Sequence, residues 1–127
     1  MQRHRDDTQW QDLAGYVRAV RSGSRIEVSG TTASAADGAA MFAGDVYGQT
    51  LDALRRSVDA VTALGGSVSD VVRTRVLLVP GCEWRDAARA HREVFADHPP
   101  ANTTLFVAGL IGDGLLVEVE VFAEVGG

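Results

Sequence analysis

Lysine is missing from this chain of 127 residues, and no run of arginines takes its place. All 12 basic residues are arginines, and 17 acidic residues outnumber them, which leaves a net charge of −5. Proteins that bind nucleic acids without sequence preference gain most of their affinity by neutralising phosphates. An acidic chain without a basic stripe is therefore not expected to have a nucleic-acid partner.

Cysteine is almost missing as well, since Cys82 is the only one. A single cysteine excludes an intramolecular disulfide and a zinc site built from cysteines. The three histidines are scattered, with no further ligand at a recognisable spacing, and the sequence has no glycine-rich phosphate loop. We therefore expect neither a metal nor a cofactor.

Long hydrophobic runs are also lacking. Residues 1–7 lead into no apolar stretch, which argues against a signal peptide, and no run of 18 apolar residues could span a membrane. We expect a cytoplasmic protein with no membrane partner. The length is that of one domain, so we assign residues 1–127 to a single domain in which residues 1–12 are a flexible or peripheral segment.

What the sequence does contain is a succession of strand and helix patterns. Alternating segments at 16–20 and 25–29 flank a turn-rich tetrapeptide and predict a β-hairpin. Further strands are predicted over residues 71–79, 103–107 and 115–124. With two helices between them, the expected order is strand, strand, short strand, helix, strand, helix, strand, strand. This order favours an α+β fold in which two helices cover one face of a mixed, mostly antiparallel sheet.

Two apolar stripes at helical spacing predict the helices. The first helix begins after Asp45, a residue type that favours the N-cap, and ends at Gly65-Gly66. The second is stopped by Pro99-Pro100, because a helix rarely continues through consecutive prolines. The first stripe consists of Tyr47, Leu51, Leu54, Val58 and Val61, and the second of Trp84, Ala87, Ala88, His91, Val94 and Phe95. His91 has two interpretations, a packed residue of the core or interface and an acid–base group active near pH 7.

The last predicted strand carries carboxylates on one face. Because side chains alternate across a strand, Glu118 and Glu120 share one face, while Val117, Val119 and Val121 share the other. The valine face is expected to lie in the core beneath the helices. The glutamate face is either a solvated sheet surface or the lining of a cleft, where a carboxyl group with a raised pKa could shuttle protons.

Arginines alternate in the same way on the strand predicted at 71–79. Arg73 and Arg75 share a face, and Thr74 points to the opposite one. They could form cross-strand ion pairs with the glutamates, or one of them could bind an anionic substrate with two parallel hydrogen bonds. Arg75 lies deeper in the strand and is the stronger candidate for substrate binding.

Several short motifs occur together in the order of one known family. They are Val28-Ser29-Gly30, the helix that contains Gln49, the stretch from Gly65-Gly66 to Asp70-Val71-Val72, and Pro100-Ala101 followed by the strand with Glu118. Together they resemble the RidA/YjgF family, formerly labelled endoribonuclease L-PSP, over residues 16–123. The resemblance implies a chorismate-mutase-like fold, a homotrimer whose sheets form a central barrel, and small-molecule clefts between subunits.

The resemblance also implies roles for individual residues. Glu118 matches the catalytic glutamate that positions or activates water, and Ser29 matches a serine that helps to stabilise developing charge. Tyr16 matches a tyrosine that packs against the substrate, and Arg18 would share its face. Together with Arg75 and His91, these residues are the candidates for the lining of the cleft.

The chain departs from the family pattern at the residue that grips the substrate carboxylate. The family has an arginine where this chain has Asn102, which is shorter and neutral. Thr104 replaces a small or thiol residue, and Ala88 replaces an asparagine on the second helix. Asn102 and Thr104 are kept as substrate-binding candidates, and Arg18 or Arg75 is the candidate for the missing cation.

The expected function is therefore that of an enzyme of the imine deaminase type. It would hydrolyse or tautomerise an enamine, an imine or a related carbonyl compound. Asn102 in place of the arginine argues against classical deamination of 2-imino acids and favours an altered substrate choice. The alternative is a trimer that binds a ligand or acts as a chaperone without turnover. An endoribonuclease is the third hypothesis, which the net charge of −5 opposes.

Overall fold

Six strands and two long helices make up most of the chain in the computed structural model, which describes residues 1–126. The strands are β1 (Gln2–His4), β2 (Ala19–Ser22), β3 (Arg25–Thr31), β4 (Val71–Leu78), β5 (Ala101–Phe106) and β6 (Val117–Glu124). The helices are α1 (Trp10–Ala14), α2 (Val46–Ala63) and α3 (Trp84–Phe95), and a short 3₁₀ turn, η1 (Val68–Asp70), precedes β4. No helix among residues 1–126 is both long enough and apolar enough to cross a membrane.

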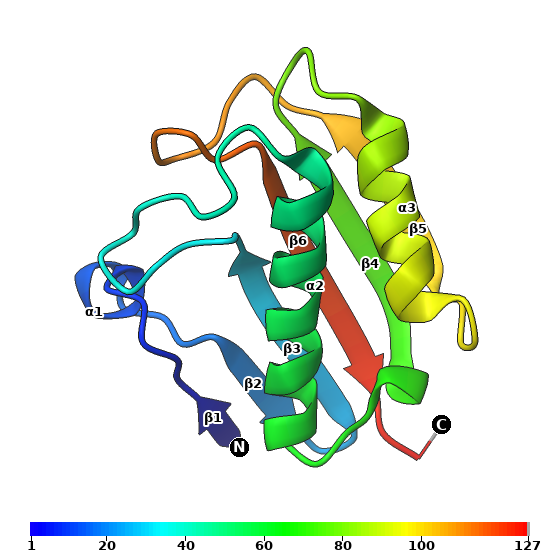
Figure 1. Ribbon diagram of the computed structural model, residues 1–127. Helices are drawn as coiled ribbons and strands as arrows, with labels where there is room; N and C mark the ends of the chain where they lie inside the picture. The colour runs from blue at the N-terminus through cyan, green and yellow to red at the C-terminus, as the bar shows by residue number, and fades with distance from the viewer. Residues whose placement is uncertain (127) are drawn as a thin grey trace.

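The strands form one mixed sheet in the order β1-β2-β3-β6-β4-β5, with α2 and α3 on the same face (Figure 1). Every neighbouring pair is antiparallel except β4 and β5, which are parallel and are joined through α3. A parallel pair needs such a crossover because a tight turn cannot connect its strands. The α+β fold with a mixed sheet that the sequence predicts is thus confirmed.

The core lies between α2 and the central strands. Val117, Val119 and Val121 of β6 are fully buried, in alternation with the glutamates on the other face. Ile26 and Val28 of β3 and the helical residue Leu54 complete this layer. The prediction that the valine face of the last strand is core is confirmed, and the glutamates consequently face away from the helices.

Helix α2 begins and ends where the sequence predicts. The Asp45 carboxylate accepts a hydrogen bond from the Gly48 amide at 2.9 Å, as an N-cap does. At the other end Gly65 has a φ of +90°, and its amide and that of Gly66 donate to the carbonyls of Thr62 and Val61. This pair of bonds is a Schellman motif, in which a glycine adopts the left-handed conformation that closes a helix.

The buried face of α2 is rotated from the predicted stripe. Tyr47, Leu51 and Val58 are only half-buried, and the fully buried positions include Gln49 and Thr50. The reason is that small and polar residues let the helix approach the sheet closely, and their polar groups find partners inside the layer. For example, the Thr50 hydroxyl donates to the Val46 carbonyl at 2.7 Å, one turn earlier in the helix.

Other details also differ from the predictions. Trp84 is 46% exposed although it was placed on the apolar stripe of the second helix. The short strand expected before α2 is reduced to a single bridge between Ser34 and Ala40. The hairpin is confirmed, but its first strand begins only at Ala19, so that Tyr16 precedes the strand.

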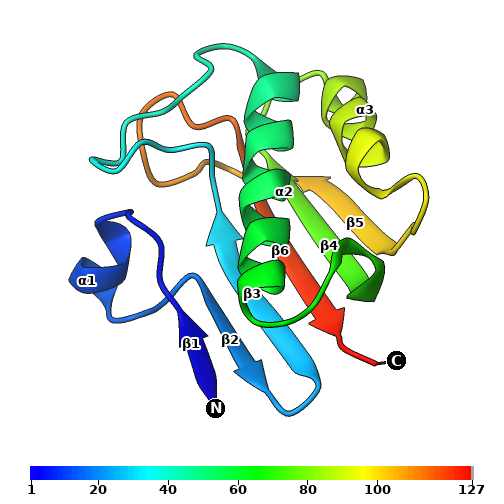
Figure 2. The same ribbon diagram turned by 60° about the horizontal axis from the view of Figure 1, so that its bottom comes forward.

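The N-terminal segment has a structure that the sequence pattern did not indicate. β1 pairs with β2 at the edge of the sheet, and α1 lies beside this edge, at the opposite end of the molecule from α3 (Figure 2). Gly15, with a φ of +75°, ends this five-residue helix. Segments this short have no measurable periodicity, which is why they escaped prediction.

Candidate active site

Glu118 lies where β3 stops pairing with β6. The last paired residues are Thr31 and Val119, so Glu118 is the first residue of β6 beyond the β3 ladder. Its carboxyl group packs against Gly30, and a Cβ atom at position 30 would lie only 3.1 Å from the Glu118 Cδ atom. Glycine at this position therefore leaves room for the carboxyl group.

The surroundings of Glu118 make its carboxyl group a weaker acid. Partial burial raises its pKa above the usual glutamate value, and the nearby Glu120 carboxylate raises it further. The positive charge of Arg18 acts in the opposite direction. A carboxyl group with a raised pKa can hold or release a proton closer to neutral pH, as a general acid or base must.

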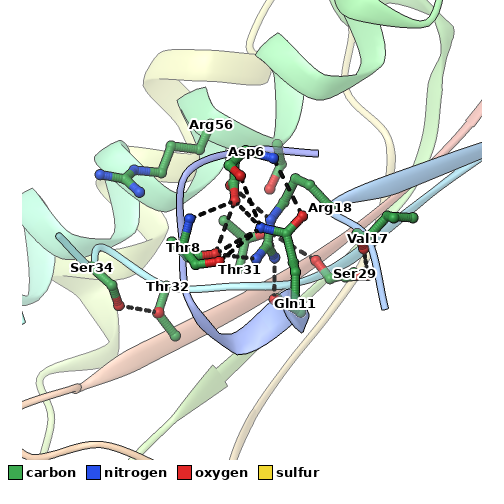
Figure 3. A network of polar contacts seen from close by, with 12 residues as sticks. Asp6, Thr8, Gln11, Val17, Arg18, Ser29, Thr31, Thr32, Ser34 and Arg56 are labelled. Carbon is green, nitrogen blue, oxygen red and sulfur yellow. Dashed lines mark hydrogen bonds and ion pairs between the residues drawn. The ribbon is translucent and has the colours of Figure 1, made fainter. Parts of the chain in front are cut away.

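Arg18 is the centre of a buried polar network (Figure 3). Its Nε atom donates to Asp6 at 2.9 Å, one terminal nitrogen donates to the Gly30 carbonyl and the Thr31 hydroxyl, and the other donates to the Thr8 hydroxyl. The residue is only 4% exposed. The network ties the chain before β2, the end of β3 and the N-terminal segment together.

Asp6 is held in its ionised form by this network. Burial tends to raise the pKa of Asp6, but the Arg18 guanidinium and the hydrogen bonds from Thr8 outweigh that effect and lower it. Gln11 adds a further hydrogen bond from its side-chain amide to the Asp6 carboxylate. The turn formed by Asp6 and Thr8 is therefore part of the wall of the candidate site.

A cavity of about 140 Å³ opens beside Glu118. Its polar wall includes Arg18, Arg56 and the hydroxyl groups of Thr8, Thr31 and Thr32, and its apolar wall consists of Trp10, Tyr16 and Ile111. The Arg18 guanidinium lies 5.8 Å from the centre of the Tyr16 ring, in the range of a cation–π contact. Tyr16, Arg18 and Glu118, three of the candidates from the sequence, thus surround one cavity.

Ser29 lies close to this group but does not line the cavity. Its hydroxyl donates to the Val17 carbonyl at 2.7 Å, and its amide donates to the Arg18 carbonyl. Ser29 faces a shallow groove shared with Tyr16 on the neighbouring surface. Within one chain its hydroxyl is therefore engaged with the backbone.

Arg75 forms a cross-strand ion pair with Glu120. The Arg75 Nη1 atom lies 2.9 Å from Glu120 Oε1, although that oxygen has no well-aligned hydrogen bond, so the contact is an ion pair only. Arg73 on the same strand donates instead to the Thr103 hydroxyl. Of the two interpretations of these arginines, a single chain therefore contains the cross-strand ion pair in the case of Arg75.

A second cavity, of about 260 Å³, lies between α3 and β5. Its polar residues form a chain of hydrogen bonds, from the Thr104 hydroxyl to Asn102 at 2.9 Å and from the Asn102 amide to the Thr74 hydroxyl at 3.0 Å. The Thr74 hydroxyl lies 2.7 Å from His91 Nε2. Thr74 accepts from Asn102 and keeps its own proton, which it can donate to Nε2 in the tautomer of His91 that is protonated at Nδ1.

His91 is kept neutral by its position. Burial lowers its pKa, and its ring packs against Phe95 with 4.7 Å between the ring centres. Trp84 lines the same cavity. His91 is therefore a packed residue in this chain, and its Nε2 atom belongs to the chain of hydrogen bonds that includes Thr74.

The site candidates thus fall into separate groups in one chain. Tyr16, Arg18 and Glu118 line the first cavity, and His91, Asn102 and Thr104 line the second. The register of β4 and β5 aligns Asn102 with Thr74, on the helix-covered face of the sheet, whereas Glu118 faces the other way. Neither of these two cavities, in the described residues 1–126, contains members of both groups.

Sequence reasoning missed several residues of the first cavity: Asp6, Thr8, Trp10, Arg56 and Ile111. Asp6 accepts from the amide and the hydroxyl of Thr8 two residues on, and an Asp-x-Thr pattern is a recognisable signal for such a turn. Arg56 carried no signal, since it lay off the apolar stripe of its helix. Among residues 1–126 no group of three histidine, cysteine or acidic side chains could hold a metal ion.

Comparisons with known proteins agree on one family. The model of the family described as Endoribonuclease L-PSP matches residues 8–125. An uncharacterised protein of Streptomyces coelicolor is 40% identical over 114 residues, which are 90% of this chain and 84% of the relative. A RutC family protein of Sulfurisphaera tokodaii is 32% identical over 87% of this chain and 88% of the relative.

Solved structures have the same fold. A member of the YjgF/YER057c/UK114 family from Mycobacterium tuberculosis is 35% identical, with a TM-score of 0.87 and 98% of each chain covered. The YjgF gene product of E. coli is 25% identical, with a TM-score of 0.81 and again 98% of each chain covered. E. coli TdcF, solved with bound serine, is 26% identical over 86% of this chain and 87% of that chain, with a TM-score of 0.74.

Proposed function

The chain belongs to the Endoribonuclease L-PSP family, which includes the RidA/YjgF proteins, and on this premise we propose that it is a small-molecule hydrolase. Its substrate would be an enamine, an imine or a related carbonyl compound bound beside Glu118. The observation that carries the proposal is the Glu118 carboxyl group, whose pKa is raised and which lines a cavity with Tyr16 and Arg18. A proton-transfer group beside a small polar cavity is what hydrolysis of a C=N bond requires.

The chemistry would proceed by addition of water to the imine carbon. As the water oxygen bonds to that carbon, the Glu118 carboxylate takes one of its protons. For an imine that is protonated at the start, the adduct is a neutral carbinolamine, and the carboxylic acid returns the proton to its nitrogen. The C–N bond then breaks while the hydroxyl group of the adduct gives its remaining proton to the Glu118 carboxylate, so that ammonia leaves and a carbonyl group remains. An enamine first needs a proton on its carbon to become an imine, and the acid form of Glu118 can supply it.

The complete site is proposed to form between subunits of a homotrimer. In that assembly the second cavity, with Asn102 and Thr104, would face the Glu118 cavity of a neighbouring copy. Asn102 offers a neutral amide that is already engaged with Thr74 and Thr104. It therefore contributes shape and hydrogen bonds to a substrate but no charge. A cytoplasmic location remains a prediction that goes with this function.

The proposal is tested by ammonia release from freshly generated 2-iminopropanoate and 2-iminobutanoate. We expect the wild-type protein to accelerate hydrolysis and Glu118→Gln to lose about 10²- to 10⁴-fold of the rate, the usual contribution of a general acid or base. Glu124→Gln is the matched control, because it removes a carboxylate from the same face of β6. Equal rates for Glu118→Gln and wild type would contradict the proposal.

A ligand-binding protein without turnover is the second candidate. The observation that favours it concerns Asn102, which occupies the position of the family's substrate-binding arginine. Its side chain is neutral and already forms hydrogen bonds with Thr74 and Thr104. TdcF with bound serine is an example of a related protein that holds a small molecule. An inert wild type that gains activity on Asn102→Arg would favour this candidate. The net charge of −5 speaks against ribonuclease activity, in spite of the family's name.

A further inference from the structure

The Glu118 cavity is lined by two guanidinium groups, and they differ in how far their donors are already used. A guanidinium has five N–H donors, and those without an acceptor in the protein are the ones that a ligand can use. Comparing the arginines near the cavity therefore indicates which of them binds an anionic ligand.

Arg18 has four of its five N–H donors engaged inside the protein. Their acceptors are Asp6, Gly30, Thr31 and Thr8. Its charge is matched by the Asp6 carboxylate at 2.9 Å, and its side chain is 5% exposed. Binding a carboxylate with two parallel hydrogen bonds would require Arg18 to give up one of these buried partners, which is costly.

Arg75 is not available either. It does not line the cavity, and its guanidinium is paired with Glu120 on the open face of the sheet. Of the two arginines that the sequence offered as substitutes for the missing cation, Arg18 thus has a single free N–H donor and Arg75 lies outside the cavity.

Arg56 of α2 lines the cavity and has donors to spare. Its Nε atom lies 2.8 Å from Asp52 Oδ2, one turn earlier in the helix, but that oxygen lacks an aligned hydrogen bond. One terminal nitrogen donates only to the Met41 sulfur at 3.4 Å, and a thioether is a weak acceptor. In Figure 3, Arg56 lies on the side of the network occupied by Asp6 and Thr8, away from Ser29 and Val17.

We propose that Arg56 is the residue that binds the carboxylate of a small anionic ligand in the Glu118 cavity. Its terminal nitrogens can donate two parallel hydrogen bonds to a carboxylate, the geometry for which arginine is suited. Thr32 belongs to the same wall, and its hydroxyl, which shares one hydrogen bond with the Ser34 hydroxyl, can add a further one. Arg56 on α2 would thereby take the role of the arginine that the family carries on β5, where this chain has Asn102.

The cavity also limits the size and charge of the ligand. A volume of about 140 Å³ is well below the 300–1,000 Å³ typical of sites for drug-sized molecules, so this cavity holds only a few heavy atoms of the ligand. With the carboxylate at Arg56, the remaining polar group of the ligand faces Glu118. The proposed ligand is therefore a small carboxylic acid that carries a second polar group. This inference rests on the proposed function only in taking the Glu118 cavity as the ligand site.

The test measures binding, separately from turnover, by isothermal titration calorimetry with propanoate and with its neutral isostere propanamide. We expect the wild type to bind propanoate more tightly than propanamide, and Arg56→Gln to weaken propanoate binding about 10- to 100-fold, as the loss of charge-assisted hydrogen bonds does. Arg55→Gln is the matched control, since Arg55 pairs with Glu93 outside the cavity, and should bind propanoate like wild type.

Asp52→Asn provides a second variant that keeps Arg56. Removing the competing carboxylate leaves Arg56 free for the ligand, so we expect propanoate to bind more tightly than to wild type. Propanoate binding that is absent in wild type, or unchanged in Arg56→Gln, would overturn the inference.

Turnover separates this inference from the proposed function. If imine hydrolysis depends on Glu118 while Arg56→Gln leaves both KM and propanoate affinity unchanged, the inference fails and the function stands. If propanoate affinity depends on Arg56 while no imine is hydrolysed, the inference stands and the function fails. If both hold, Arg56→Gln should raise KM more than it lowers kcat, because it removes an interaction made before the reaction.

Discussion

The Glu118 carboxyl group, when ionised, lowers the free energy of unfolding, so its effect on stability depends on pH. Its folded-state pKa lies above the usual value of 4.5, so the folded protein resists ionisation of this group more than the unfolded chain does. The stabilising contribution of the protonated form is therefore complete below pH 4.5 and is lost as the pH rises through the raised pKa.

Glu118→Gln should consequently be more stable than wild type at neutral pH, and its advantage should shrink at pH 4. The free energies of unfolding in urea at the two pH values measure this, with Glu124→Gln as the control for losing a carboxylate on β6. A Glu118→Gln protein that is less stable than wild type at neutral pH would contradict the raised pKa. A gain in stability with a loss of activity would be typical of a functional residue.

The Asp6–Arg18 pair should stabilise the folded protein far more than the exposed Arg5–Asp12 pair of the same segment. Arg18→Gln leaves the Asp6 carboxylate and several acceptors without their partner, so we expect a loss of about 3 kcal/mol in the free energy of unfolding. Arg5→Gln, which breaks an exposed pair with Asp12, should cost less than about 1 kcal/mol. Urea unfolding of both variants checks the contrast, and equal losses would mean that burial of Arg18 contributes nothing.

At the scale of residues, the sequence anticipated part of the site. The family resemblance pointed to Tyr16, Arg18 and Glu118, and these do surround one cavity. It could not place Arg56, because which side of a helix lines a cavity depends on the rotation of that helix against the sheet. The half-buried state of Leu51 shows that this rotation differed from the apolar stripe.

Among the elements, the segment between β5 and β6 is fastened to α2 by one side chain. The fully buried Gln49 donates from its amide to the Gly114 carbonyl at 3.0 Å and accepts from the Leu116 amide at 2.9 Å. The same segment carries Ile111 of the cavity wall and leads directly into Glu118. Gln49 is therefore a positioning residue for one side of the site.

Gln49→Leu should loosen this segment. The variant removes hydrogen bonds to two partly buried peptide groups, each worth about 1 kcal/mol, so we expect a total loss of about 2 kcal/mol and faster hydrogen exchange of the Leu116 amide. Gln9→Leu, which removes an exposed hydrogen bond to the Asp37 carbonyl, is the control and should have little effect. Unchanged exchange at Leu116 would show that the segment is held by other contacts.

The sequence predicts the longer helices and strands more accurately than the shorter ones. The hairpin, α2, β4, α3 and the last two strands were placed to within a few residues, because each has enough periodic positions or a clear stop signal. β1 and α1 were missed, since three and five residues give no period to read. Their positions depend on tertiary contacts such as the Asp6–Arg18 pair, which lies beyond the reach of local patterns.

For the molecule as a whole, the face of the sheet opposite the helices carries the proposed assembly. In the described part of the chain both long helices lie on the other face, and Phe122, Leu77 and Leu105 remain only half-buried. We expect a trimer of about 40 kDa, three times the 13.5 kDa chain, in sedimentation velocity.

Phe122→Asp should shift the protein toward the monomer mass by placing a charge on this face. Thr62→Asp introduces the same charge on the exposed side of α2 and should leave the trimer intact. A wild type that sediments as a monomer would remove the basis for clefts between subunits.

The position of β6 in the sheet has a consequence for biosynthesis. This strand lies between β3 and β4, and it pairs Glu124 with Arg25, at nearly opposite ends of the chain. Until β6 has left the ribosome, β3 and β4 have no common neighbour, and the β6 valines of the core are absent. The apolar surfaces of the growing chain therefore stay uncovered, and the fold closes only after β6 has been released.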